Sequence, residues 1–184
     1  DVSAVVDQIL SYQVDGVLSL TEVPEADARV LEGNDVVLVL YNRASAPYPA
    51  NLVSCDHRFA GRVLGDHLPA PGQPRFALAD CPRISVLAPD RAEGVLDALA
   101  GAGVGRKEVA MAIGDFGYES GRTATRSLLD RQPGFTALAC ISDMMAIGAI
   151  DEASAHGLAV PRDLSVAGFD GAPAGTWDRY RLTT

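Results

Sequence analysis

The stretch TALACISDMMAIGAIDEASAHGLAVPRDLSVAGFD, residues 136–170, predicts a strand, a helix and a second strand in succession. Residues 136–141 and 164–169 are apolar runs of strand length, and residues 144–156 carry apolar side chains at helical spacing. Gly157 comes next, and glycine is the residue that most often ends a helix. The stretch is therefore a βαβ unit, and the carboxyl ends of its two parallel strands should meet at one edge of a sheet.

Polar residues stand where each of these two strands ends. Ser142 and Asp143 follow the first strand, and Asp170 follows the second, next to Gly171. Open α/β sheets bind ligands along this edge, which favours a binding site here. The alternative is structural: Ser142 and Asp143 cap the helix, and Asp170 only shapes a turn.

The composition is that of a globular chain with an acidic balance. Its 184 residues suit one large domain or two small ones, and 48% of them are hydrophobic. The formal net charge is −9, so this chain alone lacks the basic face that a nucleic-acid backbone requires. No apolar run approaches the roughly 20 residues of a membrane span, so no membrane partner is expected. The N-terminal residues do not resemble a signal peptide.

Cysteine and histidine spacing argues against a disulfide framework and a metal site, and no cofactor is predicted. The three cysteines are widely spaced and form no CxxC motif, which favours a reducing, cytoplasmic compartment. The three histidines lack the spacing of metal ligands. These residues are Cys55, Cys81 and Cys140, with His57, His67 and His156.

Strands and helices alternate along the whole chain, which is typical of parallel sheets with helices on both faces. The expected strands are residues 17–20, 36–41, 52–54, 75–79, 109–113, 136–141 and 164–169. The expected helices are residues 2–10, 24–33, 59–68, 89–99, 120–129 and 144–156.

The Pro/Gly-rich segment PAPGQP, residues 69–74, predicts a linker that splits the alternation in two. The predicted fold class is α/β, with two doubly wound parallel-sheet subdomains and a ligand cleft between their strand ends. We place the N-terminal subdomain at 1–70 and the C-terminal subdomain at 71–176. Residues 177–184 would cross back toward the N-terminal subdomain.

Three motifs in this order are specific: GDFGYESG at 114–121, SDMMAIGAI at 142–150 and GLAVPRDLSVAGFD at 157–170. Weaker matches surround them, and together they cover nearly the whole chain. These are VDGV at 14–17, Asp56 with Gly61, His67-Leu68, Arg91 with Gly94, and LTT at 182–184. With these motifs the chain resembles the effector-binding core of LacI/GalR-type bacterial transcription repressors, which share a fold with periplasmic sugar-binding proteins.

The resemblance implies that parts of such a protein lie outside this sequence. Family members usually begin with a helix-turn-helix domain and a first βαβ portion of the N-terminal subdomain, and they continue beyond LTT. The N-terminal subdomain would then be incomplete in this chain. Operator DNA would be bound by a domain that is absent here, and the regulator would be a cytoplasmic homodimer.

The resemblance also assigns ligand-binding residues. Arg91 matches an arginine that reaches into the cleft, where its planar fork suits paired acceptors; the alternative is a surface residue on the first turn of a helix. Phe116 matches an aromatic residue that stacks on the ligand; the alternative is a core residue. Asp170 matches a residue that accepts hydrogen bonds from ligand hydroxyls, although Gly171 replaces a second aspartate.

Four further residues match positions of the family. Ser142 stands where the family often has Asn, so it would make one bond rather than a paired contact. Asp143 would cap the following helix, and Asp56 would order the helix that follows it. Arg43 lies where the other subdomain presents polar groups; it would contact the ligand or form a salt bridge across the cleft.

The sequence therefore predicts a ligand-sensing module of a LacI-type regulator, a repressor that binds a small effector. An arginine, an aspartate and an aromatic ring suit a sugar, although a nucleobase would use similar parts. The alternative is a periplasmic sugar-binding protein of an importer, with the same fold and cleft. No enzyme is predicted, because GxGxxG, P-loop and GxSxG motifs are absent.

Overall fold

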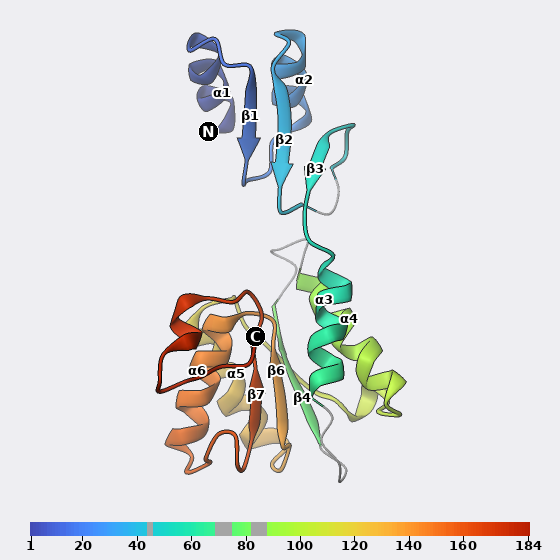
Figure 1. Ribbon diagram of the computed structural model, residues 1–184, viewed down its shortest axis with the longest axis vertical. Helices are drawn as coiled ribbons and strands as arrows, with labels where there is room; N and C mark the ends of the chain where they lie inside the picture. The colour runs from blue at the N-terminus through green and yellow to red at the C-terminus, as the bar shows by residue number, and fades with distance from the viewer. Residues whose placement is uncertain (44–45, 69–74, 82–87) are drawn as a thin grey trace. The chain divides into compact units, whose positions relative to one another are not determined.

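The computed structural model forms two compact units, which divide between Cys55 and Asp56 (Figure 1). The structure describes residues 1–43, 46–68, 75–81 and 88–184. The predicted linker, residues 69–74, lies outside the described residues, as do most of the residues between the expected strand at 75–79 and the expected helix at 89–99.

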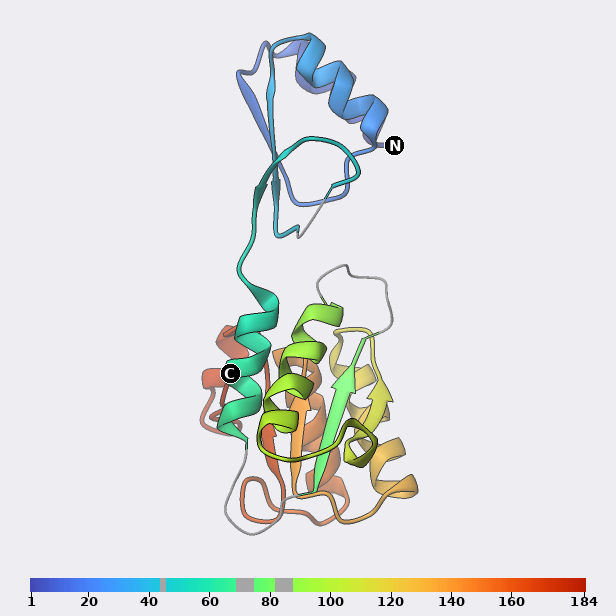
Figure 2. The same cartoon turned by 90° about the vertical axis from the view of Figure 1, so that its right-hand side faces the viewer.

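The first unit is a three-stranded parallel sheet with the order β1-β2-β3. In chain order its elements are α1 (Val2–Ser11), β1 (Gly16–Ser19), α2 (Glu25–Gly33), β2 (Val37–Tyr41) and β3 (Asn51–Val53). Both helices lie on one face of this sheet (Figure 2). The core of the unit lies on that side, and Leu31, Leu38 and Leu40 are buried in it.

The second unit has a four-stranded parallel sheet with the order β5-β4-β6-β7. Its strands are β4 (Phe76–Asp80), β5 (Ala110–Ile113), β6 (Ala137–Cys140) and β7 (Ser165–Ala167). Its α-helices are α3 (His57–His67), α4 (Ala88–Gly101), α5 (Tyr118–Arg131) and α6 (Asp143–Ala155), with short 3-10 helices η1 (Arg106–Glu108) and η2 (Pro173–Thr176).

Helices cover both faces of the second sheet. The pair α3 and α4 packs on one face, and the pair α5 and α6 packs on the other (Figures 1 and 2). The strands between them are buried almost throughout, with Leu78 and Leu138 fully inaccessible. Of the residues that predicted α6, Ile147 and Ile150 are buried, whereas Met144 is exposed.

Two glycines let α3 and α4 pack backbone against backbone. A Cβ atom on Gly61 would collide with the carbonyl oxygen of Arg91, and one on Gly94 would collide with that of Arg58. Glycine is the only residue that permits such an approach. The contact fixes α3 beside the turn of α4 that carries Arg91, and so it helps to position that side chain.

The predicted strands and helices are all present, with ends that shift by a few residues. The unit boundary falls between Cys55 and Asp56 rather than after residue 70, because α3 packs along α4 in the second unit. The C-terminal residues, predicted to cross back, lie on the second unit: Leu182 packs on its core, and Thr183 pairs with Ala167.

Candidate ligand-binding site

Loops that follow three parallel strands meet one helix at the carboxyl edge of the second sheet. Phe116 follows β5, Ser142 follows β6 and Asp170 follows β7. Arg91, near the start of α4, reaches the same edge, where it contacts Ile141 and Asp170. Four of the five predicted site residues therefore come together, as expected for the ends of parallel strands.

Arg91 is the centre of this cluster, and only 7% of the residue is exposed. Its Nη1 atom donates to Asp170 Oδ1 at 2.7 Å and to the Ile141 carbonyl oxygen at 2.9 Å. Its Nε atom donates to Nδ1 of His57 at 3.2 Å. The guanidinium carbon lies 4.1 Å from the centre of the Phe169 ring, a cation–π contact. Arg91 is thus a buried cation whose Nε and Nη1 atoms are hydrogen-bonded, rather than a surface residue.

Asp170 presents the carboxylate that pairs with Arg91, and its side chain is 41% exposed. Burial raises the pKa of Asp170 above its ordinary value, the charge and hydrogen bond of Arg91 oppose this, and the charge of Asp143 adds to it. The backbone φ of Asp170 is +125°, in a region that L-residues rarely adopt. Backbone strain of this kind is concentrated at binding and catalytic sites.

Ser142 and Phe116 are held together by a hydrogen bond between neighbouring loops. The Ser142 hydroxyl donates to the Phe116 carbonyl oxygen at 2.9 Å and accepts from the Met145 amide at 3.2 Å. Ser142 is thus the N-cap of α6, and its buried hydroxyl also orients the Phe116 loop. Phe116 is half-buried with φ +70°, and its ring centre lies 6.0 Å from the Arg91 guanidinium carbon.

The prediction that Asp143 caps α6 is wrong. Asp143 is the first residue of the helix, and its fully buried Oδ2 accepts from the Ala172 amide at 2.5 Å. It therefore anchors the turn that follows Asp170, a tertiary contact that a local reading cannot anticipate. The prediction for Asp56 is confirmed, because its carboxylate accepts from the Phe59 amide at 2.9 Å and caps α3.

Arg43 belongs to the first unit, where it follows β2. Its Nε atom is buried, and among the described residues no hydrogen-bond acceptor reaches it. Its two predicted roles, ligand contact and salt bridge, stay predictions.

Two residues of the cluster were missed by the sequence analysis. His57 accepts from Arg91, and Phe169 supplies the closer of the two aromatic rings to that cation. Burial lowers the pKa of His57, and the adjacent Arg91 charge lowers it further. The sequence could have indicated Phe169, since it stands directly before Asp170 at the strand end. It could not have indicated His57, because the partner of His57 lies on another helix.

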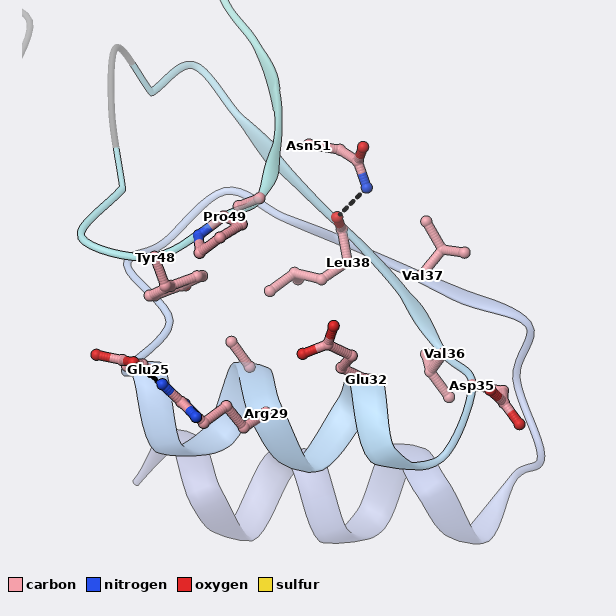
Figure 3. A pocket seen from close by; sticks show the side chains of 12 residues that line it. Glu25, Arg29, Glu32, Asp35, Val36, Val37, Leu38, Tyr48, Pro49 and Asn51 are labelled. Atoms are coloured by element: carbon pink, nitrogen blue, oxygen red, sulfur yellow. Dashed lines mark hydrogen bonds and ion pairs between the residues drawn. The ribbon is translucent and has the colours of Figure 1, made fainter.

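Two surface hollows differ in whether predicted site residues line them. One of about 810 Å³ lies in the second unit and is bordered by α3, with Phe59 and Val63, and by the segment 168–171, which includes Asp170. The other, of about 530 Å³, lies in the first unit between α2 and β2. Figure 3 shows its rim, where Glu25 pairs with Arg29. The first-unit hollow contains none of the predicted site residues.

Among the described residues, no three histidines, cysteines or carboxylates gather to hold a metal ion. Within the same part of the chain, none of the helices is both long enough and apolar enough to cross a membrane.

Parallel sheets with helical cover, and an arginine–carboxylate pair at a sheet's carboxyl edge, define a class of α/β proteins that bind small molecules. Residues 1–178 match the family described as periplasmic binding proteins and sugar binding domain of LacI family. The chain belongs to this family.

Its relatives are transcription regulators. The chain is 32% identical over 163 residues to the HTH-type transcriptional regulator GalR of Escherichia coli K12, covering 88% of this chain and 47% of GalR. It is 33% identical over 166 residues to the HTH-type transcriptional repressor CytR of the same strain, covering 90% and 49%. A solved transcriptional regulator CelR–cellobiose complex superposes with a TM-score of 0.78 at 31% identity, covering 92% of this chain and 53% of that one.

These comparisons confirm the fold class and the family that the motifs indicated. The chain spans about half the length of the curated relatives it matches.

Proposed function

We propose that this chain is the effector-sensing part of a LacI-type repressor, and that a neutral sugar binds at Arg91 and Asp170. Binding would change the affinity of the whole regulator for operator DNA, which a helix-turn-helix domain outside this chain would contact. The regulator would act as a cytoplasmic homodimer without enzymatic activity. Family membership and the regulator relatives support this role.

The Arg91–Asp170 pair is the observation that carries the proposal. A guanidinium and a carboxylate joined at 2.7 Å offer a donor beside an acceptor, the combination that recognises neighbouring hydroxyls. The rings of Phe116 and Phe169 flank the cation and suit the apolar face of a sugar ring.

The charge of the site favours a neutral ligand over a phosphorylated one. Arg91 already pairs with Asp170, and a second carboxylate, Asp143, is close enough to raise the Asp170 pKa. A phosphate would meet a neutralised cation and a nearby negative charge. An uncharged sugar or polyol would not be repelled by these carboxylates. A purine would compete for the same rings and hydrogen-bonding groups, so it belongs in the test.

The test is a thermal-shift screen of the intact protein with D-ribose, D-galactose, cellobiose, glucose 6-phosphate and adenosine. A ligand at 100 times its dissociation constant should stabilise by about 2.7 kcal/mol, roughly a 5–10 °C rise in Tm for a domain of this size. We expect a neutral sugar to raise Tm and the phosphorylated sugar to have no effect.

Variants connect the shift to the site. Arg91→Ala and Asp170→Asn should abolish it, whereas Arg58→Ala, which removes an exposed arginine paired with Asp97 on the same pair of helices, should leave it unchanged. A shift that survives both site variants would contradict the proposed residues. A sugar that binds but leaves the affinity for operator DNA unaltered would favour the solute-binding alternative.

A further inference from the structure

His57 is buried directly beside the proposed ligand-binding arginine. It is the first residue of α3, and 4% of it is exposed. Its Nδ1 atom accepts the Nε–H of Arg91 at 3.2 Å. Because the Nε of arginine is always a donor, Nδ1 must carry a lone pair, and the neutral ring must carry its proton on Nε2.

Three acceptors on three different segments fix the orientation of the Arg91 guanidinium. His57 takes the Nε–H, while Ile141 and Asp170 both accept from Nη1. Bonds to two different nitrogens prevent rotation of the planar group, and the Phe169 ring packs 4.1 Å from its central carbon. A binding group held in this way loses little entropy when a ligand arrives.

We propose that His57 is a positioning residue for Arg91, and that protonation of its imidazole ring weakens sugar binding by releasing the guanidinium. This inference rests on the proposed function of Arg91 as a sugar ligand. When His57 is protonated, Nδ1 becomes a donor, so two N–H groups face each other and two positive charges are in contact. Arg91 then loses one of the bonds that fix its plane.

The charged groups around His57 set the pH at which this occurs. Burial lowers its pKa most, and Arg91 on α4 lowers it further; Asp90 on α4 and Asp56 at the cap of α3 raise it. The net direction is downward from the ordinary value of about 6.5. The ring is thus neutral at pH 7, and sugar binding should be at full strength there. Binding should weaken only as the pH falls below the ordinary range of histidine.

The first experiment needs no ligand. In the intact protein labelled with ¹⁵N-arginine, the Nε–H signal of Arg91 should be protected from solvent exchange at pH 7.5 and lost at the lower pH where His57 is protonated. His57→Asn, whose amide oxygen can replace Nδ1 but does not titrate, should keep the signal at both pH values. His57→Leu, which has no acceptor, should lose it at both. His67→Gln is the matched control, since it removes an exposed histidine from the far end of α3.

The second experiment measures binding of whichever of D-ribose, D-galactose and cellobiose gives the largest thermal shift. Wild-type affinity should fall on the order of tenfold between pH 7.5 and the lower pH at which the wild-type Arg91 signal is lost, as expected for loss of one hydrogen bond to a charged group. His57→Asn should bind equally at both values, and His57→Leu should bind about tenfold more weakly at pH 7.5. Circular dichroism checks that each variant is folded.

Two results would overturn the inference: an Arg91 signal that persists in His57→Leu, or a wild-type pH dependence that His57→Asn leaves intact. If none of the sugars binds at all, the proposed function fails. The NMR experiment still decides whether His57 positions Arg91, so the two failures are distinguishable.

Discussion

The two sheets of this protein contain similar apolar strands that are buried to different extents. In β4 of the second unit, Phe76 to Ala79 are all buried, because helices cover both faces. In β2 of the first unit, burial alternates: Leu38 and Leu40 face the helices, whereas Val37 and Tyr41 are exposed. Leu18 of β1 and Val53 of β3 are exposed on the same face as Val37, as the register places them.

The difference teaches how far an apolar run can be interpreted. Such a run predicts a strand of a parallel sheet, and both strands confirm it. It does not state how many faces of that sheet are covered by the helices of the same unit. The second unit has two helix pairs and the larger core, and it also carries the clustered site residues. The packing of this unit and the hydrogen bonds of Arg91 hold that side chain in place, and the following predictions compare this unit with the first one.

The largest expected effect is a cavity in the second core. Leu78→Ala removes a fully buried side chain from β4 and should destabilise the second unit by about 3 kcal/mol. Val37→Ala in β2, which truncates a side chain that is 54% exposed, should cost less than about 0.5 kcal/mol. Amide hydrogen exchange of each sheet, measured by mass spectrometry, reports both values. Equal costs would mean that the exposed face of β2 is covered in solution.

The next effect comes from the contact between α3 and α4. Gly94→Ala places a methyl group against the Arg58 carbonyl oxygen, so the two helices must separate. We expect a loss of about 2 kcal/mol, typical of overpacking, together with weaker sugar binding because Arg91 lies one turn away. Urea unfolding and the thermal-shift assay measure the two effects. Unchanged binding in a destabilised variant would show that this packing does not position Arg91.

Much of the fold was predictable because its signals are local. The helix and strand periods, the glycine that ends α6 and the Ser142 cap depend on residues close in sequence. The site was predictable only in part. Asp170 was found from its place at a strand end, and Arg91 only through the family motifs; the two are 79 residues apart in sequence and join in the second unit.

The remaining site features depend on tertiary partners that no local pattern encodes. His57 has no spacing that relates it to Arg91, because α3 meets α4 through their glycines. Asp143 stands where a helix cap is common, yet its carboxylate bonds the Ala172 amide on another loop. Ser142, one residue earlier, is the N-cap, so the Asp143 carboxylate makes this tertiary contact instead.

A smaller loss of stability is expected when an ion pair is broken, and it should be larger for a buried pair than for an exposed one. Glu152 on α6 is 1% exposed and bonds Arg126 at 2.7 Å and Arg122 at 3.0 Å on α5. Glu152→Gln should cost on the order of 1–2 kcal/mol at pH 7, less than a fully buried pair because both arginines are partly exposed. The exposed counterpart in the first unit is the pair Glu25–Arg29. Glu25→Gln should destabilise that unit by less than about 0.5 kcal/mol.

The pH dependence of the Glu152 effect follows from its pKa. The hydrogen bond from Arg126 lowers that pKa most, burial opposes it, and Arg122 lowers it further. The folded pKa lies below the unfolded value, so the stabilisation is complete above about pH 4.5. It is lost as the pH falls through the folded pKa. Unfolding curves at pH 7 and pH 3 should therefore show the difference between wild type and Glu152→Gln shrinking at the lower pH.

The smallest effect is a gain, and it lies in the first unit. Gly33 is the last residue of α2, and a Cβ atom there would meet nothing within 4 Å. Gly33→Ala should stabilise the first unit by about 0.5 kcal/mol, since alanine favours a helix and restricts the unfolded chain. Gly157 is the control: it has equal space, but its φ is +77°. Gly157→Ala should therefore destabilise the second unit by about 1 kcal/mol. If both substitutions stabilised the protein, the free space around a glycine, and not its φ, would decide whether alanine stabilises or destabilises. The need for glycine at Gly61 and Gly94 would then follow from their close contacts alone.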